Sequence, residues 1–539
     1  MHSPNAESPL LPTQREHLLA RLGENPCYDV AVVGGGATGL GVALDAASRG
    51  LKVVLVEAQD FAKGTSSRST KLVHGGVRYL AQGNISLVRE ALRERTTVLH
   101  NAPHIAQPLA FVMPCYRWWE APYYGLGLTL YDQLAGKAGL GKTELLSSAQ
   151  TQQMLPMARV QGLRGGVKYW DGQFDDARLA LAIGRTAAQH GALLLNYCRA
   201  ERLRYDHGQI AGLECTDTRT HTSYQIQTRC VINATGVWVD ALREADDAAN
   251  PSDVHASVKP MVAPSQGVHL VVDQAFLDSD AALMVPKTSD GRVLFAVPWL
   301  GKVILGTTDT PSKDLAAEPT PFKEETDFIL GESARYLRRP PTRADVKSVW
   351  VGLRPLVKHH GDEGATQTLS REHTVIVSRS GLVTVTGGKW TTYRVMAEDV
   401  LSACISRGLL TTSAASSTRE LALVGSPRKA VDHTDAVSLR APQGAHSYGT
   451  EAQLISTMPG SERWLTPGLS EAMVRFAARY EYAICVEDVL ARRSRLLFLD
   501  ARLAAEVAPQ VALILEEELA SSPKLAEFLR LSEHFLSLP

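Results

Sequence analysis

Three glycines and one acidic residue near the N-terminus have the types and spacing of a nucleotide-binding turn. The stretch 28–57 reads YDVAVVGGGATGLGVALDAASRGLKVVLVE, with Gly34, Gly36 and Gly39 in G-x-G-x-x-G order and Glu57 23 residues after the first. The first glycine permits a tight bend, the second lets backbone approach a pyrophosphate, and the third lets a helix pack closely on a sheet. The acid stands where a ribose hydroxyl would be bound. These residues predict dinucleotide binding.

Apolar runs on both sides of the glycines indicate the elements that position them. A strand is expected at Val30–Val33, an amphipathic helix follows to about Ser48, and a second strand is expected at Val53–Val56. The pyrophosphate would lie on the free N–H groups of the helix start, at Ala37 and Thr38. The stretch is therefore one βαβ unit.

Composition limits the class of protein. The chain has 539 residues, 45% of them hydrophobic and 21% charged, and its net charge of -1 gives no electrostatic case for nucleic acid. The seven cysteines are scattered, so we expect reduced thiols in a cytoplasmic setting and no metal site.

No apolar run reaches the ~18 residues that span a bilayer, and we expect a protein that is soluble or lies on a membrane surface. Disorder is expected in about the first dozen residues, followed by a short helix at Thr13–Leu22.

Each of two segments after the opening unit has two possible interpretations. Residues 61–80, FAKGTSSRSTKLVHGGVRYL, predict either a solvated loop or a loop that crosses the cofactor. Residues 116–139 gather two Trp and four Tyr, and we expect a buried seam between domains, with a membrane-facing or partner-facing patch as the alternative. A helix is predicted between them, at Ile85–Leu99.

The second half of the chain changes pattern. From Val258 to Pro311, alternating strands joined by turns predict an antiparallel sheet, and hence a second domain that faces the nucleotide. Residues 350–400 return to small-residue strands, and Lys389 stands at a glycine turn before a helix expected from about Thr391, which is typical of an anion site. A helix-rich tail, expected to be a separate unit, is predicted from Ser470 onward.

Several motifs together resemble one family. The opening unit, GTSSRSTKLVHGGVRYL, INATGVWV, QGVHLVVD, FAVPWLGKVILGTTDT, GLRPL and GGKWTTYR are similar to those of FAD-dependent glycerol-3-phosphate dehydrogenase. The resemblance implies an α/β fold. It would have a Rossmann-like FAD-binding domain of the glutathione-reductase/D-amino-acid-oxidase type, an antiparallel-sheet substrate domain and a C-terminal helical domain. The implied ranges are an extension at 1–26, the FAD domain at 27–110, 160–257 and 346–405, the substrate domain at 111–159 and 258–345, and the helical domain at 415–539.

The resemblance also implies chemistry. Members oxidise sn-glycerol 3-phosphate to dihydroxyacetone phosphate by hydride transfer to FAD N5, and bacterial members pass electrons to quinone from the inner face of the cytoplasmic membrane. A homodimer is one open option. The implied cofactor-binding residues are Gly34, Gly36, Ala37, Thr38, Gly39, Glu57, Thr65, Ser66, Lys71, Gly75, Ala234, Thr235, Gly236, Gly388 and Lys389. The implied substrate-binding residues are Arg78, Tyr79, Lys389 and Thr391, and the implied catalytic residues are His269, Arg354 and Arg371.

The residue types agree with those roles. A base near neutral pKa suits loss of the hydroxyl proton, and His269 is the best candidate. Several fixed cations suit a phosphate dianion. Three alternatives stay open: a glycerol-3-phosphate oxidase that uses oxygen, a related amino-acid or hydroxy-acid oxidase, and a non-catalytic dinucleotide sensor or scaffold. Membrane contact is hypothesised for the helix at Ile85–Leu99, which carries Arg89, Arg93 and Arg95; a solvated helix is the alternative.

Overall fold

A computed structural model describes most of the chain. The described residues are 11–24, 27–77, 80, 83–250, 259–358, 372–427, 437–519 and 521–539. The first ten residues, for which disorder is expected, and the predicted site residues Arg78, Tyr79 and Arg371 lie outside these ranges. The predicted N-terminal helix is confirmed as α1, Arg15–Glu24.

A six-stranded sheet carries the glycine turn. Its order is β18-β19-β11-β1-β2-β7, and every neighbouring pair is parallel except β18–β19. The predicted strands β1 and β2 are confirmed, with β1 between β2 and β11. The bounds are β1 (Val30–Val33), β2 (Val53–Val56), β7 (Leu193–Leu195), β11 (Val231–Asn233), β18 (His373–Val377) and β19 (Val383–Gly387).

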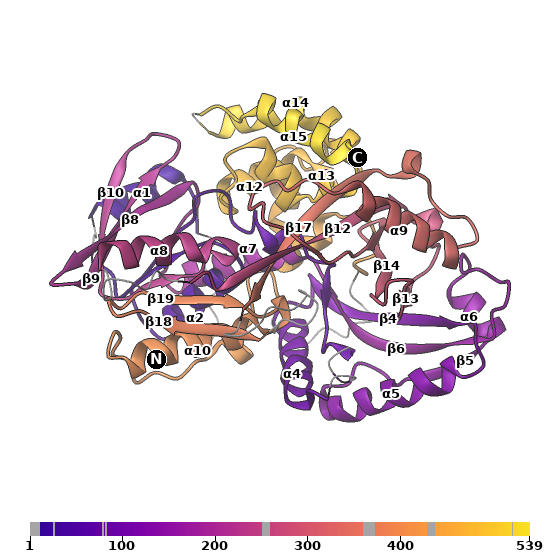
Figure 1. Ribbon diagram of the computed structural model, residues 1–539. Coiled ribbons are helices and arrows are strands. Elements are labelled where there is room, and N and C mark those ends of the chain that lie inside the picture. The colour runs from indigo at the N-terminus through magenta and orange to yellow at the C-terminus, as the bar shows by residue number, and fades with distance from the viewer. Residues whose placement is uncertain are drawn as a thin grey trace.

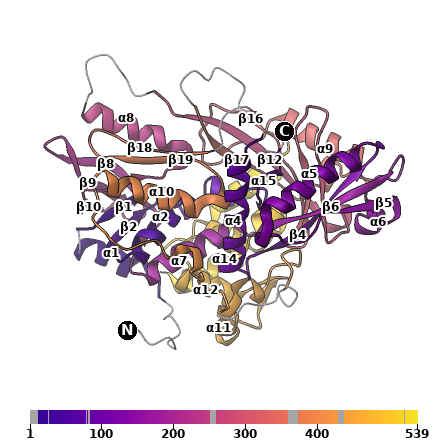
Figure 2. The same ribbon diagram turned by 90° about the horizontal axis from the view of Figure 1, so that it is seen from below.

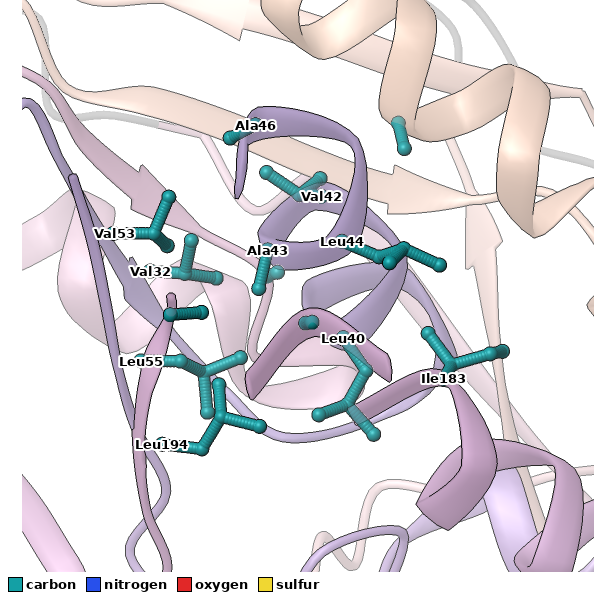
Figure 3. Packing of buried hydrophobic residues seen from close by; sticks show 14 of the residues in the cluster. Val32, Leu40, Val42, Ala43, Leu44, Ala46, Val53, Leu55, Ile183 and Leu194 are labelled. Carbon is teal, nitrogen blue, oxygen red and sulfur yellow. The ribbon is translucent and has the colours of Figure 1, made fainter. Parts of the chain in front are cut away.

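Three helices pack around this sheet and against one another: α2 (Ala37–Ser48), α7 (Asp176–Gln189) and α10 (Tyr393–Ser406). Figure 3 shows α2 inserting Leu40 and Leu44 among sheet and helix side chains that include Val32 and Ile183. Each fully buried aliphatic side chain contributes about 1.5–3 kcal/mol. Because α2 is rich in alanine and glycine, it lies close to its neighbours; a Cβ on Gly41 would come within 2.8 Å of the Tyr393 ring.

A second, largely antiparallel sheet stands beside the first (Figure 1). Its order is β16-β12-β15-β14-β13-β4-β6-β3, and β17 also pairs with β12 while β5 pairs with β6. The antiparallel strands predicted from Val258 to Pro311 are confirmed. The bounds are β3 (Leu72–Val73), β4 (Ala106–Cys115), β5 (Glu144–Ser147), β6 (Gly165–Phe174), β12 (Val262–Asp273), β13 (Ala282–Val285), β14 (Leu294–Trp299), β15 (Lys302–Gly306), β16 (Thr310–Pro311) and β17 (Ser348–Val357).

Some strands of the second sheet come from ranges expected to belong to the FAD domain. β17 falls in 346–405, and β6 falls in 160–257, yet both pair within the second sheet. Small-residue content did not reveal this, because strand pairing is a long-range property that local composition does not encode. The consequence for the site is that β12 and β17 lie edge to edge over ten register pairs.

The aromatic stretch is not a buried seam. It forms α5 (Glu120–Ala135), which packs beside α4 (Ile85–Asn101) and β6, on the outside of the molecule (Figure 2). Trp118 is 77% exposed and Leu126 is 77% exposed, although Tyr131 is buried. The expectation of a seam was wrong because aromatic content alone does not say which face of a helix is covered.

The predicted helix before it is confirmed as α4. Arg95 cannot take part in the lipid contact suggested for this helix, because it is buried and its guanidinium lies 3.0 Å from the Asp171 carboxylate. Arg89 and Arg93 are exposed. In the described part of the chain, no helix combines the length and the hydropathy needed to cross a bilayer.

The predicted helical tail is confirmed, and it packs against the second sheet. Its elements are α12 (Glu471–Tyr480), a π-helical turn (Asp488–Arg493), α13 (Leu496–Leu499), α14 (Ala501–Glu518) and α15 (Leu525–Leu536), drawn in yellow in Figure 1. Phe498 of α13 belongs to the same apolar cluster as Trp299 and Trp350 of the second sheet. All seven cysteines are free thiols, as predicted, and only Cys27 is exposed.

Candidate active site

A cavity of about 580 Å³ opens where the parallel strands end. Its lining includes the residues that follow β1, β2, β11 and β19, which is where ligands of open α/β sheets bind. The predicted cofactor residues that line it are Gly34, Gly36, Ala37, Thr38, Glu57, Thr65, Ser66, Ala234, Thr235, Gly236, Gly388 and Lys389. The fold therefore brings together residues that are far apart in sequence, such as Gly34 and Lys389, which are separated by 355 positions.

The glycines of the turn are required by geometry. Gly34 has φ of +110°, and a Cβ there would lie 2.5 Å from the Ala234 carbonyl oxygen. A Cβ on Gly39 would lie 1.9 Å from the Gly34 carbonyl oxygen. Gly39 does not line the cavity; it lets α2 approach the strand end closely, which is the packing role expected of the third glycine.

Glu57 is held by the backbone at the rim of the cavity. Its carboxylate accepts hydrogen bonds from Gly35 N–H at 2.7 Å and from Gln59 N–H at 2.8 Å. Burial raises the pKa of Glu57, and these two N–H groups oppose that rise. The carboxylate is only half-buried, so its remaining lone pairs can accept hydroxyl hydrogen bonds from the cavity side.

The segment 61–80 lies along the cavity through Thr65 and Ser66. The Ser66 hydroxyl accepts the Ala37 N–H at 2.9 Å, and the Thr65 hydroxyl donates to Leu353 O of β17 at 2.6 Å. The loop thus bridges the start of α2 and the second sheet. This placement favours the cofactor-crossing interpretation over a solvated loop.

Two predicted cofactor residues of this segment lie elsewhere. Lys71 is 0% exposed, and its ammonium donates to Asp176 at 2.7 Å and to Ser67 O at 2.7 Å. Gly75 N–H donates to the Tyr131 hydroxyl at 2.8 Å. Neither residue lines the cavity. Their assignment to the cofactor stays a prediction, and in the structure the Lys71 ammonium is bound by a buried carboxylate.

His269 stands on β12 next to β17, and its register partner is Trp350. The ring is 2% exposed, stacks on the Trp350 indole with centroids 4.1 Å apart, and places Nε2 2.9 Å from the Thr70 hydroxyl. Burial, with the charges of Lys71 and Arg354, lowers the pKa of His269 well below its ordinary value. The lowered pKa favours the neutral imidazole, which keeps a lone pair on one ring nitrogen.

Arg354 is a fixed cation one strand away from His269. Its guanidinium donates to Thr307 Oγ1 at 3.1 Å and Thr308 O at 2.9 Å, and lies 3.5 Å from the Asp309 carboxylate. Lys389 lines both the main cavity and a neighbouring one of about 380 Å³. These two cations stand on different elements, Arg354 on β17 and Lys389 directly after the Gly387–Gly388 turn at the end of β19.

Comparisons with known proteins decide the family. Residues 29–394 match the FAD dependent oxidoreductase family, and residues 416–525 match the C-terminal domain of alpha-glycerophosphate oxidase. The mitochondrial glycerol-3-phosphate dehydrogenase of Mus musculus is 39% identical over 94% of this chain and 73% of its own length. The Arabidopsis thaliana mitochondrial enzyme is 38% identical over 96% of this chain and 86% of its own length.

A solved structure agrees. The glycerol-3-phosphate dehydrogenase of Bacillus halodurans, complexed with FAD, has a TM-score of 0.76 and 31% identity, covering 97% of this chain and 98% of that one. The chain belongs to the FAD-dependent glycerol-3-phosphate dehydrogenase family. Its cofactor is FAD, which fits the cavity: glycines leave room for a pyrophosphate at the start of α2, and Glu57 lines the same cavity.

Sequence reasoning missed several cavity residues of this dehydrogenase. Trp238 and Trp390 line the cavity, and Trp390 Nε1–H donates to Ser66 O at 2.8 Å. Both tryptophans directly follow recognised turns, which was a usable signal. Arg199, Ala200 and Glu201 of β8 (Cys198–Asp206) also line it, and no local pattern marks them. Predicted Thr391 is buried, and its hydroxyl accepts the His74 N–H at 3.3 Å, so it braces the site from outside the cavity lining.

Proposed function

We propose that this dehydrogenase oxidises sn-glycerol 3-phosphate to dihydroxyacetone phosphate. The observation that carries the proposal is His269, a neutral buried imidazole connected through Thr70 to the loop that lines the FAD cavity. Family membership supplies the substrate class, because the relatives are named for it. The non-catalytic alternative predicts that FAD binds but that no substrate reduces it.

His269 has the chemistry of the base. Oxidation of a secondary alcohol removes a hydride from carbon and a proton from the hydroxyl group. FAD, when bound, supplies the hydride acceptor. His269 accepts the proton, and the neighbouring charges of Lys71 and Arg354 return it to the neutral state readily because they disfavour imidazolium.

Cations around the base suit the substrate's phosphate. Arg354 is half-buried and fixed by backbone and hydroxyl acceptors, so a dianion meets it already oriented. Lys389 adds a second positive charge at the turn before α10. Arg78 and Arg371, which lie outside the described residues, would complete the predicted ring of charge.

The test is a visible spectrum of the holoenzyme under anaerobic conditions. Addition of sn-glycerol 3-phosphate should bleach the flavin band, while glycerol, lactate and an amino acid should not. Bleaching by lactate or an amino acid instead would show that the enzyme acts as a hydroxy-acid or amino-acid oxidase. A spectrum unchanged by all four compounds would refute the proposed activity.

Quinone is the proposed electron acceptor, and a lipid surface is the proposed location. On α5, Trp119, Tyr123, Leu126 and Leu130 recur at spacings of four, three and four residues, so they share one helix face. All four are exposed, as is Leu145 of β5, which lies against α5 at Gly125. An exposed apolar face of this size marks an interaction site.

The composition of this face favours lipid over a protein partner. Trp and Tyr prefer the membrane interface, and exposed Arg117, Lys137 and Lys142 flank the two ends of α5, where they would meet anionic headgroups. A helix with an apolar face and a basic rim lies in the plane of the interface. We infer peripheral attachment through α5 at the inner face of the cytoplasmic membrane, where quinone dissolves.

Sedimentation with vesicles of phosphatidylcholine and phosphatidylglycerol tests this contact. The wild-type protein should pellet at low salt, and the double variant Tyr123→Ser/Leu126→Ser should stay in the supernatant. Leu513→Ser, which removes an equally apolar side chain that is 62% exposed on α14, is the matched control and should pellet. Wild-type protein left in the supernatant at low salt would contradict the lipid assignment.

Reoxidation distinguishes quinone from oxygen. Substrate-reduced enzyme should be reoxidised by a water-soluble quinone much faster than by air. Rapid reoxidation by air with stoichiometric hydrogen peroxide would instead favour the glycerol-3-phosphate oxidase alternative.

A further inference from the structure

Among the described residues, one ring nitrogen of His269 has a hydrogen-bond partner and the other has none. Nε2 lies 2.9 Å from the Thr70 hydroxyl, and within the described ranges Nδ1 is buried with no hydrogen-bond partner. Which nitrogen of a histidine carries the proton is set by the hydrogen bond that the other makes. The hydrogen bond between Thr70 and Nε2 therefore influences which ring nitrogen of His269 carries the proton.

The cost of an unpaired donor selects the tautomer. If Nδ1 carried the proton, a buried N–H would have no acceptor among the described residues, and such orphaned donors are rare. If Nε2 carries it, the N–H donates to Thr70 Oγ1 and Nδ1 keeps a lone pair. Burial and the charges of Lys71 and Arg354 disfavour the doubly protonated ring, so only one of the two nitrogens carries a proton.

The plane of the ring is fixed by Trp350. The two rings are 19° from parallel, and Trp350 is itself 2% exposed. The Lys71 ammonium lies 4.6 Å from the same indole centroid, and the Phe498 ring centroid lies 5.4 Å from it. Because the indole is packed by these neighbours, it cannot tilt, and the imidazole stacked on it keeps a single orientation.

We propose that Thr70 and Trp350 are positioning residues for the reaction: Thr70 accepts the Nε2–H and so leaves Nδ1 as the basic atom, while Trp350 fixes the plane in which Nδ1 accepts the proton. In the step itself the substrate O–H bond breaks and its proton passes to Nδ1, while FAD, when bound, would accept the hydride from the carbon. This inference rests on the proposed role of His269 as the base.

Thr70→Val removes the acceptor at nearly constant volume, and Thr70→Ser restores it. In anaerobic stopped-flow experiments, T70V should slow flavin reduction at saturating substrate about 10- to 100-fold, less than the ~10²–10⁴-fold contribution of a general base. The apparent substrate dissociation constant and the FAD content should stay within about twofold of wild type. T70S should recover most of the rate. A wild-type rate in T70V would overturn the inference.

A double-mutant comparison separates this inference from the proposed function. If Thr70 acts through His269, T70V should slow His269→Ala no further. If His269→Ala itself reduces flavin at the wild-type rate, the base assignment fails. If His269→Ala is slow and T70V is fast, the base assignment stands and only the positioning role fails.

A second readout does not depend on turnover. In holoenzyme labelled with ¹⁵N-histidine, the His269 signals are those lost in His269→Asn. Nδ1 should show the ¹⁵N chemical shift of an unprotonated nitrogen, and in T70V that shift should move toward the value for a mixture of tautomers. A protonated Nδ1 in the wild type would overturn the assignment.

Trp350→Leu tests the role of the indole, with Trp350→Phe as the aromatic control. In Trp350→Leu, entry of water should raise the His269 pKa toward its ordinary value, so the acid limb of the pH profile of flavin reduction should move to higher pH. An unmoved acid limb in Trp350→Leu would overturn the role of Trp350.

Discussion

Arg493 in the C-terminal region and Asp60 beside the FAD cavity form a buried ion pair although 433 positions separate them in the sequence. Arg493 Nη2 lies 3.0 Å from one carboxylate oxygen, and Arg492 binds the same carboxylate through Nε. All three side chains are at most 2% exposed. The C-terminal helices are thus attached to the nucleotide-binding sheet by charge as well as by apolar contact.

Removing one partner of this pair should be costly. Arg493→Met leaves the Asp60 carboxylate buried with reduced compensation, and a loss of about 3–5 kcal/mol is expected. The measurement is the midpoint of thermal unfolding of the holoenzyme. Arg202→Met is the control, because Arg202 pairs with Glu214 at the surface and should change the midpoint little. Equal midpoints for the two variants would show that the buried pair does not hold the regions together.

Acid should weaken the same junction. Although burial alone would raise it, the charges of Arg492 and Lys63 lower the pKa of Glu487 to about 2 from the ordinary 4.5. A depressed folded-state pKa gives stability that is complete above about pH 4.5 and is lost as pH falls toward 2. Glu487→Gln should therefore be less stable than wild type by ~1–3 kcal/mol at pH 7 and nearly equal to it near pH 2. Urea midpoints across that range measure the difference, and a gap that does not narrow in acid would contradict the assignment.

Gly39 should tolerate no side chain. In Gly39→Ala the methyl group would meet the Gly34 carbonyl at 1.9 Å, so α2 must move away from the strand end. We expect loss of FAD or of folded protein, measured by the flavin absorbance of the purified chain. Gly127→Ala in α5 is the matched control, since no atom lies within 4 Å of its Cβ position. A fully yellow Gly39→Ala protein would show that the turn is less tightly packed than described.

Glu57→Ala should lose FAD during purification. The substitution removes the carboxylate that the Gly35 and Gln59 N–H groups hold at the cavity rim. Glu57→Gln keeps the shape and one acceptor, so it should retain more flavin. The ratio of flavin to protein absorbance measures both variants, and full occupancy in Glu57→Ala would argue against a ribose contact.

Lys389→Ala should chiefly weaken substrate binding. A point charge that binds phosphate contributes to the ground state and to the transition state alike, so KM rises while kcat changes less. His269→Ala should do the reverse and lower kcat far more than it raises KM. Steady-state assays with sn-glycerol 3-phosphate measure both, and an unchanged KM in Lys389→Ala would remove it from phosphate binding.

The sequence was sufficient for elements with a local signal. The turn at Gly34, the flanking strands and the helix after it follow from apolar periodicity and glycine spacing, which act over a few residues. The ion pair of Lys71 could not be predicted because its partner, Asp176, is 105 positions away. Trp118 and Leu126 were misplaced because exposure depends on which face the rest of the chain covers. Thr70, Trp350 and Phe498 come together only through pairing of β12 with β17 and docking of α13, which no local pattern encodes.

The contact between Phe498 and Trp350 bears on the order in which the enzyme matures during its synthesis. Chains fold from the N-terminus as they leave the ribosome, so both sheets and the FAD cavity emerge before residue 498 does. Until then Trp350 lacks the Phe498 ring, and Asp176 lacks the Arg495 guanidinium that lies 3.1 Å from it. The packing behind His269 is therefore completed after the cofactor site has been synthesised.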